Sequence, residues 1–175
     1  MPTAHKTTII ILALVIFGAV GCDVDPTTGY TTRDQYVQNV RSVCVPMWNR
    51  GRDVYRRDLE FRITESIVKE IQANTKYKIS EEARADTILT GEIIGVSQEV
   101  MAFNPDTGNP REKEITITLA FTWTDLRNGK MLAHEDAMEV TGTYIPDFGE
   151  DFFQGSQDVL DEAARQVVRH MEADW

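Results

Sequence analysis

The residue types that most often carry catalysis or bind metals do not form a recognisable constellation in this sequence. His134-Glu135 begins like a zinc-protease helix motif, but Met138 stands where the second histidine ligand is required. The glycine spacing matches no phosphate-binding loop, and neither Ser97 nor Ser156 has the flanking glycines of a nucleophile elbow. The sequence therefore predicts a non-enzymatic protein with no metal and no other cofactor.

Basic side chains gather in one short segment of an otherwise acidic chain. Arginine guanidinium groups match the geometry of phosphate oxygens, so this segment is a candidate contact for an anionic ligand. The alternative is a solvated loop whose charges meet the acidic surface of the same domain. The four residues are Arg50, Arg52, Arg56 and Arg57.

A second segment, residues 141–155, combines acidic and aromatic side chains. Exposed aromatic residues are common in protein–protein interfaces, so the segment is a candidate contact for a protein partner. The alternative is that these rings hold the last helix against the core. The four candidate residues are Tyr144, Phe148, Phe152 and Phe153.

The N-terminus indicates the compartment in which the protein works. Lys6 precedes an apolar run of 12 residues, from Ile9 to Val20, which is shorter than the roughly 20 residues that a membrane-spanning helix needs. A short apolar run behind a basic start is typical of a secretory signal peptide. The segment ends in small residues directly before Cys22.

This ending resembles the lipobox of bacterial lipoproteins, in which the cysteine is acylated and becomes the new N-terminus. Ala19 stands where the lipobox usually has leucine, and the alternative is an ordinary signal peptide with an incidental cysteine. We expect residues 1–21 to be the signal peptide and residues 22–38 to be a tether. Acyl chains on Cys22 would hold the protein on the outer membrane, facing the periplasm, although Asp23 is compatible with retention at the inner membrane.

Composition limits the class of the remaining chain. The 175 residues are 42% hydrophobic and 26% charged, which predicts one soluble domain, over residues 39–175. The net charge of −10 argues against a nucleic-acid ligand and against a polybasic membrane-surface protein. Cys44 lies in an apolar run and is expected to be a buried thiol.

Hydrophobic periodicity places the elements that must position these segments. Residues 39–47 and 77–79 read as short strands, which suggests that they form a β-α-β unit with the helix between them. That helix covers residues 58–75, where apolar residues recur every four positions and Asp58 is the expected N-cap. A long strand is expected over residues 87–103, with a bulge or bend at Gly91 or Gly95.

The C-terminal half predicts a hairpin followed by a helix. Residues 115–124 alternate between apolar and polar side chains, and Asn128-Gly129 favours a type I′ turn into a strand over residues 131–140. A last helix follows, with Ser156 as its cap. The order β-α-β-β-β-β-α predicts an α+β fold in which two helices pack on one face of a four- to five-stranded, mostly antiparallel sheet.

Three stretches together resemble a known family. They are Val45-Pro46-Met47 through DLEFRITESIVKEI, then KYKISEEARADTILTGEII, then TWTDLRNGKML. Their order and spacing are similar to those of the lipopolysaccharide-assembly lipoproteins (LptE-like). The resemblance implies a protein of the outer membrane that plugs the large β-barrel which inserts lipopolysaccharide, helps that barrel to fold, and binds lipopolysaccharide itself. It also implies two helices on a four-stranded sheet.

Two other functions remain open. One is a lipoprotein that activates a peptidoglycan synthase, because the segment ARADTILTGEI also resembles strands of such activators. About 16 residues separate Cys22 from the first expected strand, a span of less than roughly 60 Å, which favours a partner close to the membrane. The other is a lipid-anchored hydrolase, for which the sequence offers no site.

Overall fold

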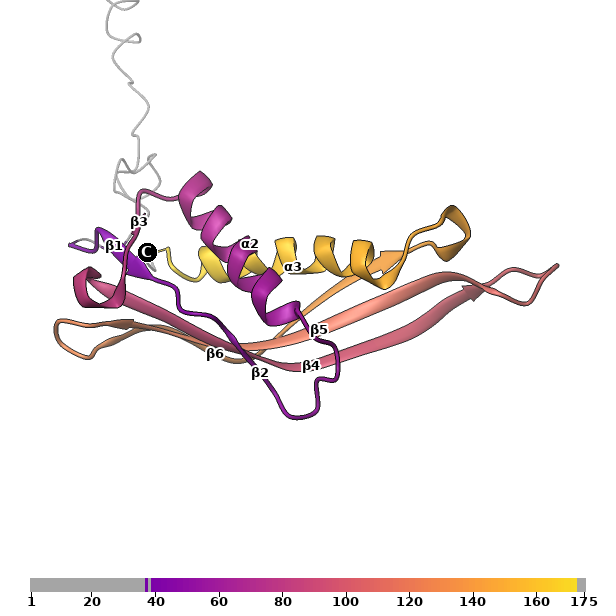
Figure 1. Cartoon of the computed structure of the whole chain (residues 1–175), viewed down its shortest axis with the longest axis horizontal. Helices are drawn as coiled ribbons and strands as arrows, with labels where there is room; N and C mark the ends of the chain where they lie inside the picture. Colours follow the sequence, from indigo (N-terminus) through magenta and orange to yellow (C-terminus); the bar gives the residue numbers. More distant parts are fainter. Residues whose placement is uncertain (1–36, 38, 173–175) are drawn as a thin grey trace, which may run out of the picture. The chain divides into compact units, whose positions relative to one another are not determined.

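The computed structural model describes residue 37 and residues 39–172 (Figure 1). Cys22, the predicted signal peptide and all of the predicted tether except Val37 lie outside the described residues. Among the residues that are described, no helix is long and apolar enough to cross a membrane.

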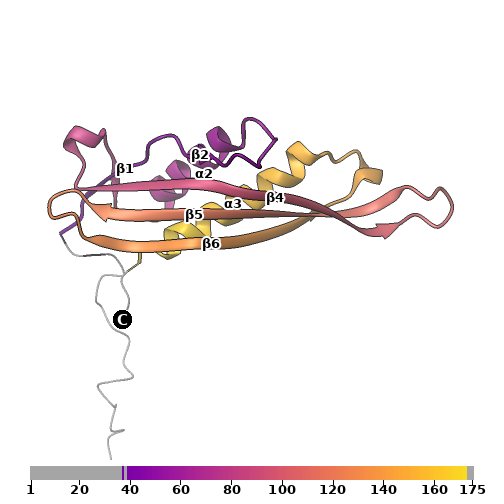
Figure 2. The same ribbon diagram turned by 90° about the horizontal axis from the view of Figure 1, so that it is seen from below.

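Two long helices lie on the same face of a sheet, as the sequence predicts (Figures 1 and 2). The α+β class is thereby confirmed. In chain order the elements are β1 (Ser42–Cys44), β2 (Asn49–Arg50), α2 (Leu59–Asn74), β3 (Lys78–Ile79), the 3₁₀ turn η1 (Glu82–Arg84), β4 (Thr87–Phe103), β5 (Pro110–Asp125), β6 (Met131–Tyr144), the 3₁₀ turn η2 (Pro146–Phe148) and α3 (Phe152–Arg169).

The sheet has six strands and mixed pairing, which corrects the expectation of four to five mostly antiparallel strands. Its order is β3-β1-β4-β5-β6, and β2 pairs with β4. The long strands β4, β5 and β6 are antiparallel neighbours, whereas β1 pairs in parallel with both β3 and β4, and β2 pairs in parallel with β4. The one strand that was not predicted is β2, which has two residues and docks on the edge of β4, a tertiary contact that leaves no periodic signal in the sequence.

The core lies between the helices and one face of the three long strands. Every second residue of β5 from Ile115 to Trp123 is at most 2% exposed, which confirms the alternation predicted for this strand. The stripe of α2 from Leu59 to Ile71 is buried in the same core. Apolar burial on this scale, at roughly 25 cal/mol per Å², is the main stabilising term of such a layer.

Two glycines allow α3 to lie close to β6. A Cβ atom on Gly142 would stand 2.7 Å from Cγ2 of Val159, and a Cβ atom on Gly155 would stand 2.8 Å from Cβ of Tyr144. Tyr144 is accordingly buried beneath α3, at 5% exposure. It belongs to β6, so the expected loop at residues 141–155 is shorter than predicted.

Several predicted boundaries need correction. Helix α3 begins at Phe152 and is capped by Asp151, whose carboxylate accepts from the backbone N–H of Gln154, while Ser156 lies inside the helix. Asp58 occupies the cap position of α2 but has a left-handed backbone, with φ of 73°, and no side-chain capping bond. The β5–β6 connection is a five-residue loop in which Gly129 but not Asn128 has positive φ, so it is not a type I′ turn.

The strand predicted over residues 39–47 is shorter in the structure, where β1 covers only Ser42–Cys44, but two other predictions about β1 and β4 are confirmed. Cys44 is buried in β1, and that burial, with a smaller contribution from Glu82, raises the pKa of its thiol. The register of β4 shifts between Ile93 and Gly95, which is the expected irregularity. Gly91 has a different role, because a Cβ atom there would stand 2.6 Å from the ring of Trp48.

Candidate functional site

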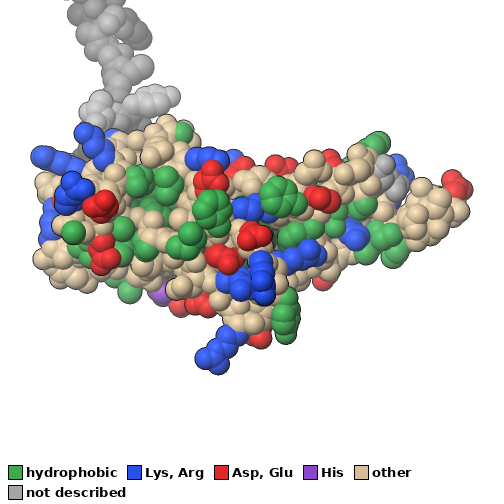
Figure 3. All heavy atoms as spheres, viewed as in Figure 1, with side chains coloured by type: hydrophobic (Ala, Val, Ile, Leu, Met, Phe, Trp, Pro, Cys, Tyr) green, Lys and Arg blue, Asp and Glu red, His purple; other side chains and the backbone are tan. Residues whose placement is uncertain are grey.

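The arginine segment forms a loop that projects between β2 and α2, and Figure 3 shows basic side chains gathered on it. Contacts with β4 and with the core hold the base of this loop in place. The backbone N–H of Gly51 donates to the carbonyl of Ile93 over 2.8 Å, and Val54 is only 2% exposed. Arg50 donates from Nη1 to the carbonyl of Val54 over 2.8 Å, and its Nε lies 3.5 Å from Oε1 of Glu60. Arg50 therefore closes the loop rather than facing a ligand.

The tip of the loop is presented to solvent. Arg52 and Arg57 are exposed, and within the part of the chain that the structure describes neither makes a hydrogen bond or an ion pair. Tyr55, between them, is 88% exposed. Arginine and tyrosine are the residue types that dominate binding hot spots, so this tip has the composition of a contact surface.

The structure brings part of the arginine loop together with part of the aromatic segment, although about 95 residues separate them in the chain. Cζ of Arg56 lies 3.9 Å from the ring centroid of Phe152. Arg56, Arg57, Phe152 and Phe153 line one cavity of about 360 Å³, at the point where α2 and α3 begin. A cation over an aromatic face is attracted by the quadrupole of the ring, and this attraction favours the position of the arginine side chain over the ring.

Arg62 is the residue of this cavity that sequence reasoning missed. It is 8% exposed, and Cζ lies 4.0 Å from the ring centroid of Phe153. Its Nη1 donates to Oγ of Ser156 and its Nη2 donates to the carbonyl of Phe153, over 2.9 and 2.8 Å. Nε and Nη2 also donate to Oε1 of Gln157. Arg62 thus ties α2 to α3.

Burial lowers the pKa of Arg62, and the nearby carboxylates of Asp161, Asp151 and Asp58 oppose that shift. A sequence signal for this residue exists. Arg62 lies three positions after Leu59, on the stripe of α2 that faces the core. A buried charge must be hydrogen-bonded, so a charged residue on an apolar stripe indicates a specific partner.

The other aromatic candidates do not join this cavity. Tyr144 is buried under α3 and is not available as a surface contact in this domain, which corrects its assignment. Phe148 is 82% exposed and lines a different cavity, of about 490 Å³, together with residues of the β4–β5 hairpin. In that hairpin Met101 and Phe103 are 55% and 62% exposed, so this end of the sheet exposes several apolar side chains.

The face of the long strands that points away from the helices is polar. Its cross-strand rungs run through β5, which places a residue of β4 and a residue of β6 on either side of each β5 residue (Figure 2). Threonine and short polar residues dominate. The rungs are Glu99–Glu114–Thr143, Ser97–Thr116–Thr141, Gly95–Thr118–Glu139 and Thr90–Thr122–His134.

No group of three or more histidine, cysteine or carboxylate side chains within the described ranges could hold a metal ion. His134 lies on β6, where its Nδ1 is 3.0 Å from Oγ1 of Thr122 and its Nε2 is 2.9 Å from Oδ1 of Asp136. These contacts hold the ring on the sheet surface.

Comparison with solved structures identifies the same fold in other bacterial proteins. A hypothetical protein from Chlamydia trachomatis matches with a TM-score of 0.54 at 10% identity, over 75% of this chain and 97% of that one. An uncharacterised lipoprotein B from Nitrosomonas europaea matches with a TM-score of 0.52 at 16% identity, over 81% and 88%. At these identities the likeness concerns the fold alone.

No curated protein sequence matches this chain. The family model for LptE, described as lipopolysaccharide-assembly, matches residues 40–174 and so spans nearly all of the described domain. The protein therefore belongs to the LptE lipopolysaccharide-assembly family, a family of non-enzymatic lipoproteins of the outer membrane.

Proposed function

We propose that this protein is a structural subunit that assembles with, and plugs, the outer-membrane β-barrel that inserts lipopolysaccharide. In this proposal acyl chains on Cys22 anchor it to the outer membrane on the periplasmic side. The single observation that carries the proposal is the family match over residues 40–174. The surfaces of the domain supply the physical support.

The polar outer face of the sheet suits the inside of a barrel. Large membrane barrels have polar, water-filled interiors, because their strands alternate lipid-facing apolar residues with lumen-facing polar ones. A domain that fills such a barrel must therefore present polar side chains to the barrel wall, in fixed positions. The threonine and glutamate rungs on β4, β5 and β6 do this, and the long strands hold them in a fixed register.

The apolar end of the sheet offers a second contact for the same partner. Val100, Met101, Phe103 and Phe148 are between 41% and 82% exposed there. Exposed apolar side chains that gather in one place mark interaction sites, because their solvation is costly. We place a barrel contact at this end, together with Phe153, which is 61% exposed at the start of α3.

Lipopolysaccharide is a second candidate ligand, through its anionic groups. Arg52, Arg56 and Arg57 are exposed on the projecting loop and are the residues that would contact it, whereas Arg50 is engaged within the loop. The net charge of −10 disfavours tight binding of an anionic glycolipid. We therefore assign assembly with the barrel as the main role and lipid contact as the lesser one.

Affinity capture of the full lipidated protein from detergent-solubilised membranes tests the main role, with partners identified by mass spectrometry. We expect one large outer-membrane β-barrel in near-stoichiometric amount. Recovery of a peptidoglycan synthase without a barrel would contradict the proposal and support the alternative function. A Cys22→Ala variant is expected to lose membrane attachment, which tests the anchor separately.

A binding measurement with purified lipopolysaccharide tests the lesser role. The variant Arg52→Ala/Arg57→Ala removes two exposed cations that have no partner in the described structure, and Arg84→Ala removes an exposed cation paired with Glu81 elsewhere. Weak binding that the double variant reduces is the expected result. Tight binding that depends on the arginine loop would show that lipid contact, and not assembly, is the main role.

A further inference from the structure

One stretch of β4 has a backbone edge that no other described strand covers. β1 and β2 pair with β4 only at residues 87–88 and 92–93, and the backbone N–H of Gly51 donates to the carbonyl of Ile93. From Gly95 to Val100, β4 pairs with β5 over six residues without a register shift, and its other side has no partner within the described part of the chain. This is the length of an ordinary strand, so one more strand has room here. We call Gly95–Val100 the free edge.

The free edge lies in the half of β4 that leads to the β4–β5 hairpin, and this hairpin extends past both helices (Figures 1 and 2). Its side chains alternate between the two faces of the sheet. Val96 and Val100 lie on the face that carries the core, and Val100 is 41% exposed. Ser97 and Glu99 lie on the outer face, and both are exposed. A strand beside the free edge would therefore meet apolar side chains on one face and polar side chains on the other.

The outer face of the free edge carries a pair of like charges. Glu99 is directly opposite Glu114 of β5, and Glu112 follows on the same face. Among the described residues, neither Glu99 nor Glu114 has an ion-pair or hydrogen-bond partner for its side chain. Arg111 and Lys113 alternate with the carboxylates of β5 and so lie on the opposite face. Like charges opposite each other on neighbouring strands are destabilising, so a cation placed beside Glu99 would relieve this repulsion.

The edge of β6, at the other side of the three long strands, is less suited to a further strand. Two residues of β6, Asp136 and Ala137, stand opposite the single residue Ala120 of β5, so the ladder is interrupted there. Charged side chains, among them Glu135 and Glu139, also lie along β6. Bulges and charges are the means by which natural edge strands avoid further pairing. The free edge of β4 contains no register shift and only one charged side chain.

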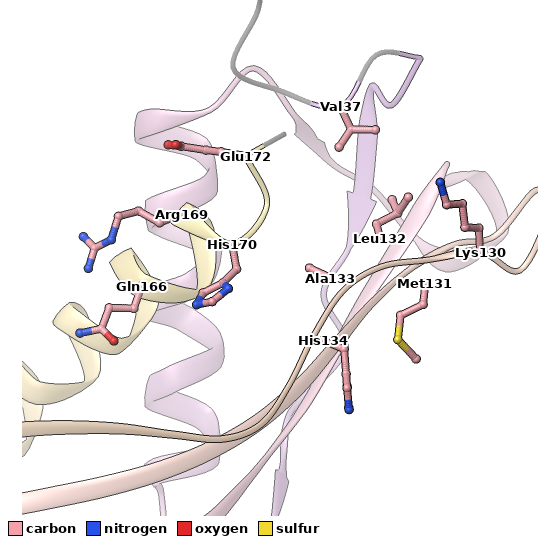
Figure 4. A pocket seen from close by; sticks show the side chains of 10 residues that line it. All are labelled: Val37, Lys130, Met131, Leu132, Ala133, His134, Gln166, Arg169, His170 and Glu172. Atoms are coloured by element: carbon pink, nitrogen blue, oxygen red, sulfur yellow. The ribbon is translucent and has the colours of Figure 1, made fainter. Parts of the chain in front are cut away.

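The hollow beside the start of β6 shows no preference for one kind of charge. It has a volume of about 640 Å³ and lies between that strand and the end of α3. Figure 4 shows Arg169 and His170 of α3 on one side of it and Ala133 of β6 on the other. Lys130 and Glu172 also line it, so both signs of charge are present. The outer face of the free edge, by contrast, presents only negative charge.

We propose that the free edge binds an extended segment of a partner protein as an additional strand, and that this segment alternates basic and apolar side chains. Backbone groups of the two strands supply the hydrogen bonds, and the alternating side chains supply the specificity. The apolar side chains of the segment cover Val96 and Val100, and a basic side chain lies beside Glu99. This binding needs an extended segment and no barrel, so it goes beyond the proposed plugging role.

Charge argues against the two occupants that this protein could itself supply. A second copy would bring a free edge with one acidic and no basic side chain, and each chain has a net charge of −10, so two copies repel each other. The protein's own residues 23–36 contain three aspartates and one arginine, so they are acidic as well. A basic segment of another protein therefore matches the free edge best.

Peptide binding to the full lipidated protein in an uncharged detergent tests this proposal. The probe is a peptide of about eight residues, enough to span the free edge, in which Lys and Val alternate. One control peptide alternates Glu and Val. The other control has the Lys-Val sequence with every backbone nitrogen methylated, so it keeps the charge but cannot donate a backbone hydrogen bond. We expect both controls to bind about tenfold more weakly than the probe.

Amide hydrogen exchange, read by mass spectrometry, locates the bound probe. Exchange over residues 95–100 should slow severalfold with the Lys-Val peptide, whereas exchange over residues 138–144 of β6 should stay the same. Protection of β6 instead, or equal protection by the methylated peptide, would overturn the proposal. Full protection of residues 95–100 without peptide would also overturn it. Loss of that protection on dilution would identify a second copy as the occupant, and its loss on deletion of residues 23–36 would identify the N-terminal segment.

Two matched charge reversals test the role of Glu99. Glu99→Lys should weaken binding of the Lys-Val peptide about fivefold and should strengthen binding of the Glu-Val peptide. Glu82→Lys makes the same change at an exposed residue of η1, before the start of β4, and should leave both affinities unchanged. Equal weakening by the two variants would overturn the proposal, because the peptide would then respond only to net charge. If Glu99→Lys lowers the melting temperature, Glu99→Gln should still weaken binding in a folded protein. No barrel is present in these measurements, so barrel capture decides the plugging role separately.

Discussion

The two faces of the long strands β4, β5 and β6 share one backbone but carry opposite chemistry. The face toward the helices holds Ile115, Ile117 and Leu119 at 0% exposure, while Thr116 and Thr118 between them point the other way. Burial of the first face stabilises the fold. The second face contributes little to that packing, so its regular polar rungs are free to serve assembly. Stability and partner binding should therefore respond to different residues of the same strand.

The largest expected effect comes from a pair of neighbours on β5. Ile117→Ala should lower the free energy of unfolding by about 2–5 kcal/mol, because it removes buried methyl groups and leaves a cavity. Thr118→Ala, one residue away on the outer face, should change it by no more than about 0.5 kcal/mol. Urea unfolding followed by circular dichroism measures both. Similar losses of unfolding free energy for the two variants would contradict the claim that only the inner face stabilises the fold.

A second pair compares two glycines of β4. Gly91→Ala would place Cβ 2.6 Å from the buried ring of Trp48, so we expect a loss of about 1–3 kcal/mol from overpacking. At Gly95 the nearest atom to an added Cβ is Oγ1 of Thr118, at 3.3 Å, and this side chain can rotate away. Gly95→Ala should therefore be nearly neutral in the same unfolding measurement. A larger loss of stability for Gly95→Ala than for Gly91→Ala would mean that side chains on the outer face are also tightly packed.

A buried carboxylate at the end of β5, that of Asp125, should have a smaller effect on stability, and this effect depends on pH. Hydrogen bonds from the side chain of Arg127 lower the pKa of Asp125 from 3.8 to about 2. Because the folded pKa is depressed, the carboxylate stabilises the fold fully above about pH 4 and loses this contribution as the pH falls toward 2. The difference in melting temperature between wild type and Asp125→Asn should be constant near neutral pH and should shrink over that window. A difference that grows toward low pH would contradict the assignment.

The periodic elements could be predicted from sequence because their signals are local. The four-residue recurrence from Leu59 to Ile71 predicts α2 closely, and the alternation in β5 predicts which residues are buried. The start of α3 was misplaced because Ser156 and Asp151 are both good caps. Only the reciprocal bond with Gln154, three positions after Asp151, selects Asp151.

The candidate site was predicted in parts but not as a whole. The arginine loop and Phe152–Phe153 were each identified, yet no local pattern indicates that Arg56 stacks on Phe152. The separation of Arg50 from the other arginines depends on Glu60 and the carbonyl of Val54, and the burial of Tyr144 depends on Gly155. The two-residue parallel strand β2 is likewise set by docking on β4 and not by its own residues.

The most direct test of the central claim, that the outer face of the sheet carries assembly, is barrel capture by two charge-matched variants. Thr116→Lys/Thr141→Lys adds two lysines to one rung of that face, and Gln72→Lys/Ala73→Lys adds two to exposed positions of α2. Both should fold, although the two lysines of the first variant face each other across neighbouring strands and should lower its melting temperature slightly. The account predicts that the first variant loses the barrel in quantitative affinity capture, whereas the second retains it. Retention of the barrel by the outer-face variant would contradict the account.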